Sequence, residues 1–78
     1  MNRHMSNNDL QARIDGHIKV SAVKFPNSNP DRYLYVWNRL RDFYIHGHIT
    51  IKQKYDMEEY IENVLNVTVE DYGFIHDR

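Results

Sequence analysis

The sequence predicts one small α+β domain, in which a sheet of two or three short strands packs against two helices. Three segments favour this class. Residues 29–46 repeat their apolar side chains with the period of a helix, whereas residues 17–25 and 48–55 alternate apolar and polar side chains as strands do. A chain of 78 residues is long enough for one domain only. We expect residues 1–5 to form a flexible tail and residues 6–78 to form the domain.

The segment before Pro26 has two interpretations. Ser6 and Asp9 have the spacing of a helix-capping pair, which favours a short helix that stops at Gly16. The alternative is a hairpin whose turn includes the same glycine. Both interpretations continue into a strand over residues 17–25.

The clearest helix covers residues 29–46. Asn29 is a suitable N-cap, Pro30 suits the first helical position, and Gly47 is a suitable stop. Apolar side chains recur along this segment at helical spacing, at Tyr33, Trp37, Leu40 and Tyr44.

Residues 48–55 also have two interpretations. Their alternation predicts a strand, followed by a second helix that Asp56 caps. The competing interpretation caps a longer helix at Thr50, with Gln53 as its reciprocal partner, and converts the fold into a helical hairpin with flanking short strands. A closing strand is expected over residues 67–75.

A short stretch carries a resemblance to a known family. The run Leu40-Arg41-Asp42-Phe43-Tyr44 is followed by Gly47-His48-Ile49-Thr50. This pattern resembles the helix–Gly–Ile-Thr–helix core of short bacterial oligomerisation modules of the SHOCT type. The acidic-aromatic motif that follows the threonine in those modules is replaced here by Ile51-Lys52-Gln53-Lys54, so we assign the chain to no family.

Composition and charge narrow the classes of function. The chain has no cysteine, which excludes a disulfide framework and a thiolate zinc site. It has neither an apolar run of the ~20 residues that cross a membrane nor the features of a signal peptide, so we expect a cytoplasmic protein without a membrane partner. Residues 1–45 carry seven Lys and Arg against four acids, a net +3, and residues 46–78 carry three against seven, a net −4. Such a polar molecule suits a charged partner or a second copy of itself.

Four side chains are candidate metal ligands. His46 and His48 flank Gly47, and His76 and Asp77 lie further along the chain. Imidazole binds zinc, copper and nickel well. A protein site needs three or four ligands in fixed geometry, and no second spaced pair is present, so we expect no metal and no cofactor.

Catalysis is not expected either. The serines lack a nucleophile-elbow context, and the three glycines are not clustered as in a phosphate-binding loop. The nearest acid–base candidates are glutamates on the outer side of the second predicted helix, where solvation is their expected role. They are Glu58, Glu59 and Glu62.

The aromatic helix gives the best indication of a partner. Aromatic side chains lie around most of the circumference of this helix, and a domain of this size is not expected to bury all of them. Tyr, Trp and Arg are the residue types that contribute most of the binding energy at protein interfaces. The predicted partner-binding residues are Tyr35, Trp37, Arg39, Arg41 and Tyr44. We therefore expect a non-enzymatic interaction module, a small regulator or inhibitor that binds another protein, with a homodimer as a further state. Small, cysteine-free, aromatic-rich domains are typical of phage and mobile-element proteins, which suggests such an origin.

The alternative is a small DNA- or RNA-binding regulator. Its basic surface would comprise Lys19, Lys24, Arg32, Lys52 and Lys54. Its C-terminal half would resemble a helix-turn-helix motif with a second helix beginning at Thr68. That helix would carry Glu70, Asp71 and Asp77, which repel phosphate, so this alternative ranks second.

Overall fold

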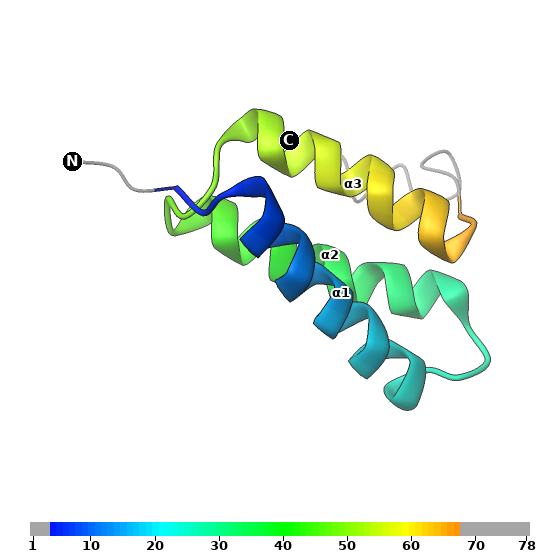
Figure 1. Cartoon of the computed structure of the whole chain (residues 1–78). Helices are drawn as coiled ribbons and strands as arrows, with labels where there is room; N and C mark the ends of the chain where they lie inside the picture. The colour runs from blue at the N-terminus through cyan, green and yellow to red at the C-terminus, as the bar shows by residue number, and fades with distance from the viewer. Residues whose placement is uncertain (1–3, 68–78) are drawn as a thin grey trace.

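The computed structural model describes residues 4–67 and forms a bundle of three α-helices over this range. They are α1 (Asn7–Lys24), α2 (Asn29–Ile45) and α3 (Ile51–Leu65). Figure 1 shows the three helices packed against one another, and α2 makes most of the contacts between helices. The predicted α+β class is wrong, because the described residues contain no strand.

One continuous helix, α1, replaces the predicted short helix and the strand over residues 17–25. Its start is as predicted, because the Asp9 backbone N–H donates to Ser6 Oγ at 3.1 Å. Gly16 does not stop the helix. A strand would have buried Ile18 and Val20 on one face, but their exposed fractions are 8% and 40%. The helical period decides the structure, and the buried positions of α1 are Leu10, Ile14, Ile18 and Ser21.

The predicted helix over residues 29–46 is confirmed as α2, with a different cap. Ser28 is the N-cap, and its Oγ accepts the Asp31 backbone N–H at 3.3 Å. Asn29, the predicted cap, is the first helical residue. Its Nδ2 donates instead to the Leu65 carbonyl at 2.8 Å, which ties the start of α2 to the end of α3.

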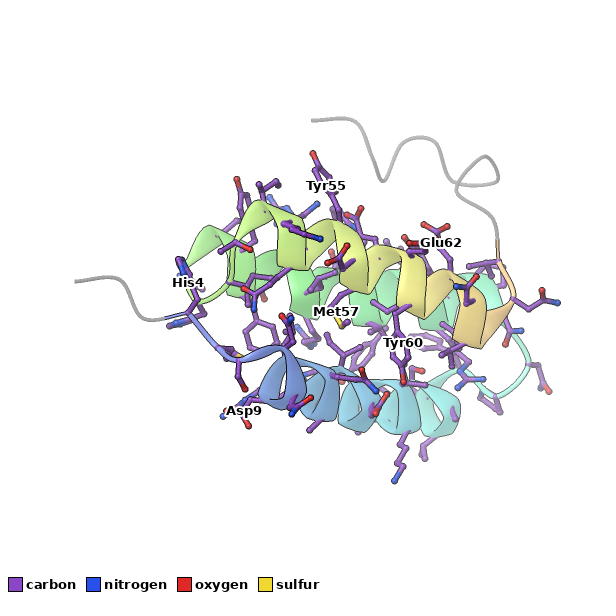
Figure 2. All side chains as sticks on the ribbon, turned by 45° about the horizontal axis from the view of Figure 1, so that its top comes forward. His4, Asp9, Tyr55, Met57, Tyr60 and Glu62 are labelled. Atoms are coloured by element: carbon purple, nitrogen blue, oxygen red, sulfur yellow. The ribbon has the colours of Figure 1, made fainter. Side chains whose placement is uncertain are left out.

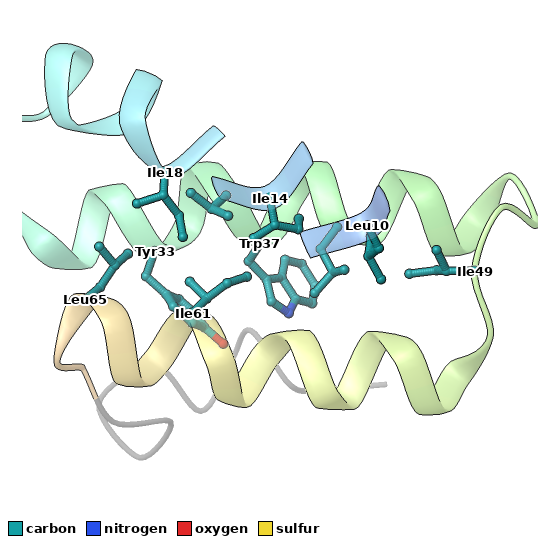
Figure 3. Packing of buried hydrophobic residues seen from close by; sticks show 10 residues of the cluster. Leu10, Ile14, Ile18, Tyr33, Trp37, Ile49, Ile61 and Leu65 are labelled. Atoms are coloured by element: carbon teal, nitrogen blue, oxygen red, sulfur yellow. The ribbon is translucent and has the colours of Figure 1, made fainter. Parts of the chain in front are cut away.

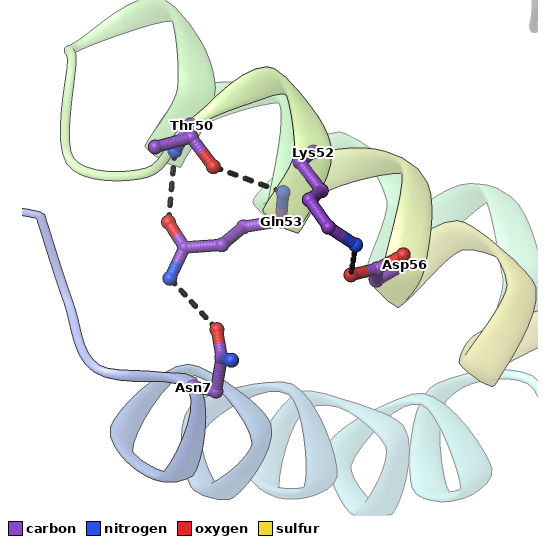
Figure 4. Close-up of polar contacts among 5 residues, drawn as sticks. All are labelled: Asn7, Thr50, Lys52, Gln53 and Asp56. Atoms are coloured by element: carbon purple, nitrogen blue, oxygen red, sulfur yellow. Dashed lines mark hydrogen bonds and ion pairs between the residues drawn. The ribbon is translucent and has the colours of Figure 1, made fainter.

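The predicted strand over residues 48–55 is wrong, and the competing helix cap at Thr50 is observed. Thr50 Oγ1 accepts the Gln53 backbone N–H at 3.0 Å, and Gln53 Oε1 accepts the Thr50 backbone N–H at 2.8 Å (Figure 4). This reciprocal capping box satisfies two backbone donors at the start of α3. Asp56, the predicted cap, lies inside α3, where it pairs with Lys52 Nζ at 3.1 Å.

The chain reverses direction between α2 and α3 at Gly47. Its φ of +77° lies in the left-handed region that side chains disfavour. Ile49 follows the reversal and is buried, so the connection closes one end of the core.

The core lies between the three helices, and α2 contributes more of its buried apolar residues than α1 or α3 does (Figure 3). Every helix contributes apolar side chains at helical spacing, so their burial holds the bundle together. The buried apolar residues are Leu10, Ile14, Ile18, Tyr33, Val36, Trp37, Leu40, Ile49, Ile61 and Leu65.

Polar contacts fix the chain just before α1 to the start of α3. Gln53 Nε2 donates to the Met5 carbonyl at 2.7 Å and to Asn7 Oδ1 at 3.0 Å, the second of which is drawn in Figure 4. The Met5 backbone N–H donates to the His48 carbonyl at 2.8 Å. Met5, which the sequence places in the tail, is therefore held by two hydrogen bonds, one to the α2–α3 connection and one to α3.

The end of α3 turns back towards the core. Asn66 has left-handed backbone angles (φ 56°, ψ 48°), and the Val67 backbone N–H donates to the Glu62 carbonyl at 3.1 Å. This is the Schellman arrangement, in which the residue after the turn contacts the helix it has left. Val67 packs against the core. The rest of the predicted closing strand over residues 67–75, and the second helix of the helix-turn-helix alternative, lie outside the described residues.

Candidate functional site

Three half-exposed apolar side chains lie where α2 ends and α3 begins. Tyr44, Ile51 and Tyr55 have exposed fractions of 39%, 41% and 45%. Ile51 and Tyr55 are four residues apart and so are neighbours on one face of α3. The rings of Tyr44 and Tyr55 both lie near the ammonium group of Lys54. Its Nζ is 6.0 Å from the centroid of the Tyr44 ring and 5.5 Å from that of the Tyr55 ring. We call Tyr44, Ile51 and Tyr55 the α2–α3 patch.

Tyr55 faces away from α1. In Figure 2, it projects outward from α3 on the side opposite α1, whereas Tyr60 points towards α1. Tyr55 therefore does not contribute to the contact between these two helices.

A buried ion pair lies beneath the patch. Lys54 Nζ donates to Glu58 Oε2 at 2.6 Å, and Trp37 Nε1 donates to the same oxygen at 2.9 Å. Lys54 and Glu58 are each only 4% exposed. The ammonium group also lies 5.3 Å from the centroid of the Trp37 ring, within the range of a cation–π contact. These contacts compensate the two charges inside the protein, so Lys54 and Glu58 present neither a nucleophile nor a base to a substrate.

Charged side chains adjoin the patch on both helices. Arg41 precedes Tyr44 by three residues, and Lys52 precedes Tyr55 by three residues, so each lies beside a patch ring on its own helix. Glu59 follows Tyr55 by four residues and so lies one turn beyond it, towards the C-terminus of α3. All three charged side chains are exposed, and Lys52 is paired with Asp56 at 3.1 Å.

The five predicted partner-binding residues do not form one surface. Nine residues turn a helix through about two and a half turns, so Tyr35 and Tyr44 point to opposite sides of α2. Trp37 is in the core. Arg41 and Tyr44 alone lie at the α2–α3 patch.

Tyr35 packs within the molecule. Its ring centroid lies 6.3 Å from that of Phe25, and the Arg39 guanidinium carbon lies 4.8 Å above it. An open pocket of about 190 Å³ adjoins these rings, lined by Phe25, Asp31, Leu34, Tyr35 and Asn38. Tyr35 and Arg39 therefore pack around the loop after α1, away from the patch.

The five basic residues of the nucleic-acid alternative are also separated. Arg32 is used internally, because its Nε donates to Ser21 Oγ at 3.1 Å and its guanidinium also contacts the Ile18 carbonyl. Lys52 pairs with Asp56, and Lys54 is buried against Glu58. The remaining two, Lys19 and Lys24, are exposed on α1. These five residues provide no continuous basic surface.

Two of the described side chains have shifted pKa values: Tyr60 at the contact of α3 with α1, and His17 at the contact of α1 with α2. Tyr60 donates its hydroxyl proton to Asp15 Oδ1 at 2.5 Å, and this hydrogen bond, with burial and the carboxylate charge, raises the pKa of Tyr60. Burial lowers the pKa of His17, assisted by the charges of Arg39 and Arg13.

Neither shifted group has the arrangement of a metal site or a catalytic pair. The His46 and His48 rings lie 6.2 Å apart, yet nowhere in residues 4–67 do three His, Asp or Glu side chains come together as metal ligands.

Ile51 and Tyr55 were missed as candidate site residues. The strand interpretation puts Ile49 and Ile51 on one face of a strand and places Tyr55 at its end, where it would pack against Tyr60 of the following helix. The signal was present in the sequence, because a cap at Thr50 with Gln53 sets the phase of α3 and turns Ile51 and Tyr55 outward.

Over residues 4–67, no helix has both the length and the apolar character that a membrane span requires. Comparison with protein-family models, with curated proteins and with solved structures found no match.

Proposed function

We propose that this protein is a non-enzymatic interaction module, a small regulator or inhibitor that docks on another protein through the α2–α3 patch. The observation that carries the proposal is the exposure of Tyr44, Ile51 and Tyr55 above a filled core. The polar groups beneath the patch have partners inside the protein, and no buried side-chain nitrogen or oxygen of the described residues lacks one. The inner side of the patch covers Lys54, and its outer side leaves apolar surface in water.

The chemistry of the patch suits a protein partner. Tyrosine supplies a large contact area with few rotatable bonds, and tyrosine and arginine are enriched among the residues that dominate binding energy. Arg41 lies beside Tyr44 and adds a charged group with several hydrogen-bond donors. Removal of this apolar area from water would supply the affinity, and the surrounding charges would supply the orientation.

A matched pair of variants tests the proposal. Tyr55→Glu places a charge in the patch, whereas Val23→Glu places the same charge at an 81% exposed position on α1. Each chain is immobilised and used to capture proteins from its native host, and captured proteins are identified by mass spectrometry. Circular dichroism confirms that both variants remain helical.

The expected result is a protein that the original chain and Val23→Glu both retain and that Tyr55→Glu loses. Purified, that protein should bind the original chain with defined stoichiometry by calorimetry. If every captured protein binds Tyr55→Glu as well as the original chain, the α2–α3 patch is not a docking surface and the proposal fails.

A further inference from the structure

We infer that three aromatic rings and one carboxylate on the inner side of the α2–α3 patch form a binding site for a primary alkylammonium group, which Lys54 occupies in this chain. The residues of the site are Trp37, Tyr44, Tyr55 and Glu58. The inference goes beyond the proposed function, because it holds whether or not another protein docks on the outer side of the patch.

Aromatic rings from two helices face the ammonium group of Lys54. Its Nζ lies 5.3 Å from the centroid of the Trp37 ring, and the Tyr44 and Tyr55 rings lie 6.0 Å and 5.5 Å from it. The face of an aromatic ring attracts a cation within about 6 Å, and several rings around one cation form an aromatic cage, which proteins use to bind ammonium ligands. Because α2 supplies two of the rings and α3 the third, the packing of these helices builds the cage.

Glu58 sets the chemical class of the ligand. Its Oε2 accepts a hydrogen bond from Lys54 Nζ at 2.6 Å and another from Trp37 Nε1 at 2.9 Å. A quaternary ammonium ion has no N–H to donate, and a neutral alcohol brings no charge to compensate the buried carboxylate. The next carboxylate along α3, Glu62, accepts the Tyr33 hydroxyl proton at 3.4 Å. The site therefore fits a primary alkylammonium, such as a lysine side chain, better than a choline-like group.

Lys54 keeps free amines out of this site. The side chains of Lys54 and Glu58 are each 6% exposed, so the ammonium group already fills the space between the rings and the carboxylate. A ligand on a short tether has an effective concentration of about millimolar or more, which a dilute free amine does not match. Loss of the Lys54 side chain should open the site, because Tyr44 and Tyr55 on its outer side are only half covered.

Chemical rescue tests the inference. Lys54→Ala removes the side chain beyond Cβ, and n-propylammonium supplies the missing carbons and the ammonium nitrogen. A ligand this small is expected to bind with a dissociation constant of about 1–10 mM. At about ten times that concentration, the unfolding equilibrium constant of Lys54→Ala in urea should fall by about tenfold at constant ionic strength. If the variant is unfolded without ligand, n-propylammonium should restore its helical circular dichroism.

Two further ligands separate charge and hydrogen bonding from simple filling of a cavity. Propan-1-ol has nearly the shape of n-propylammonium without its charge, and tetramethylammonium has the charge without an N–H donor. Neither should stabilise Lys54→Ala as n-propylammonium does. Trp37 is the only tryptophan, so a nitrogen-15 spectrum contains one indole N–H resonance, which n-propylammonium should shift saturably.

Matched variants locate the response. Lys52→Ala frees the exposed Asp56 in the same helix and at the same spacing, and n-propylammonium should not stabilise it, because water screens that carboxylate. The original chain should not respond either, since Lys54 fills its site. Lys54→Ala/Glu58→Gln keeps the rings and removes the negative charge, so it should lose the response.

Equal stabilisation of Lys54→Ala by propan-1-ol and n-propylammonium overturns the inference, because the space would then be an apolar cavity only. An undiminished response of the double variant also overturns it, as does a Lys54→Ala chain that n-propylammonium neither stabilises nor refolds. None of these results bears on the proposed function, which is decided in chains that retain Lys54 by capture of a partner that depends on Tyr55.

Discussion

Removal of the buried cation beneath the patch should destabilise the bundle strongly. Lys54→Met keeps the length of the side chain and its helix propensity, so the change is mainly electrostatic. It leaves the Glu58 carboxylate 4% exposed and without the ammonium group that lies 2.6 Å away. Breaking a buried pair from one side costs about 3–5 kcal/mol, a large part of the ~5–15 kcal/mol by which small domains are stable.

The matched control is in the same helix at the same spacing. Lys52 and Asp56 also form an i, i+4 pair, at 3.1 Å, but their side chains are 82% and 56% exposed. Lys52→Met should therefore cost no more than about 0.5 kcal/mol. The comparison separates the effect of burial from the effect of losing a lysine from α3.

The measurement is urea unfolding at neutral pH, followed by circular dichroism and by the fluorescence of Trp37, the only tryptophan. The double variant Lys54→Met/Glu58→Gln removes both charges and keeps an oxygen acceptor for Trp37 Nε1. It should be more stable than Lys54→Met alone, because no uncompensated charge remains. If Lys54→Met costs no more than Lys52→Met, water screens the pair and our account of the structure beneath the patch is wrong.

Three further predictions follow from contacts outside the buried pair. Gln53→Ala removes the reciprocal cap and the tie to the chain before α1, and should lower the free energy of unfolding in urea by about 1–2 kcal/mol; an unchanged midpoint would contradict this. Tyr60 should ionise at higher pH than an ordinary tyrosine because of its hydrogen bond to Asp15, so Tyr60→Phe should remove a late step from the ultraviolet titration. The stability that this bond contributes is present below pH 10, the unfolded pKa, and is lost as pH rises through the raised value; a variant with the same alkaline unfolding profile would refute it. Tyr35→Ala should lower the melting temperature, because the packing of its ring on Phe25 is lost; an unchanged melting temperature would contradict this.

Two helix starts were more predictable than the fold class. The caps at Ser6 and Thr50 are visible in the sequence because a cap depends on residues only three positions apart. The predicted fold class is wrong because residues 17–25 and 48–55 alternate apolar and polar side chains as strands do, yet lie in α1 and at the start of α3. Short alternating runs also occur in helices with one exposed apolar side chain, as Val20 shows.

The site was predictable only in part. Sequence alone shows that α2 has more rings than one face can hold, but the burial of each ring depends on where α1 and α3 pack. Trp37 lies against α3 and is buried, whereas Tyr35 faces the loop after α1. The burial of Lys54 could not be predicted for the same reason. Lysine is usually exposed, and Lys54 is buried because it points from α3 towards the rings of Trp37 and Tyr44 on α2.

The central position of α2 determines how the chain can be divided. Its buried side chains contact α1 on one side and α3 on the other, so neither helical hairpin contains a complete hydrophobic core. During synthesis, Tyr33 and Trp37 emerge before the helix that covers them, and their apolar surface stays in water until α3 has left the ribosome. A fragment that ends before α3 should therefore aggregate or remain unfolded, and the three helices should gain and lose their structure as one cooperative unit.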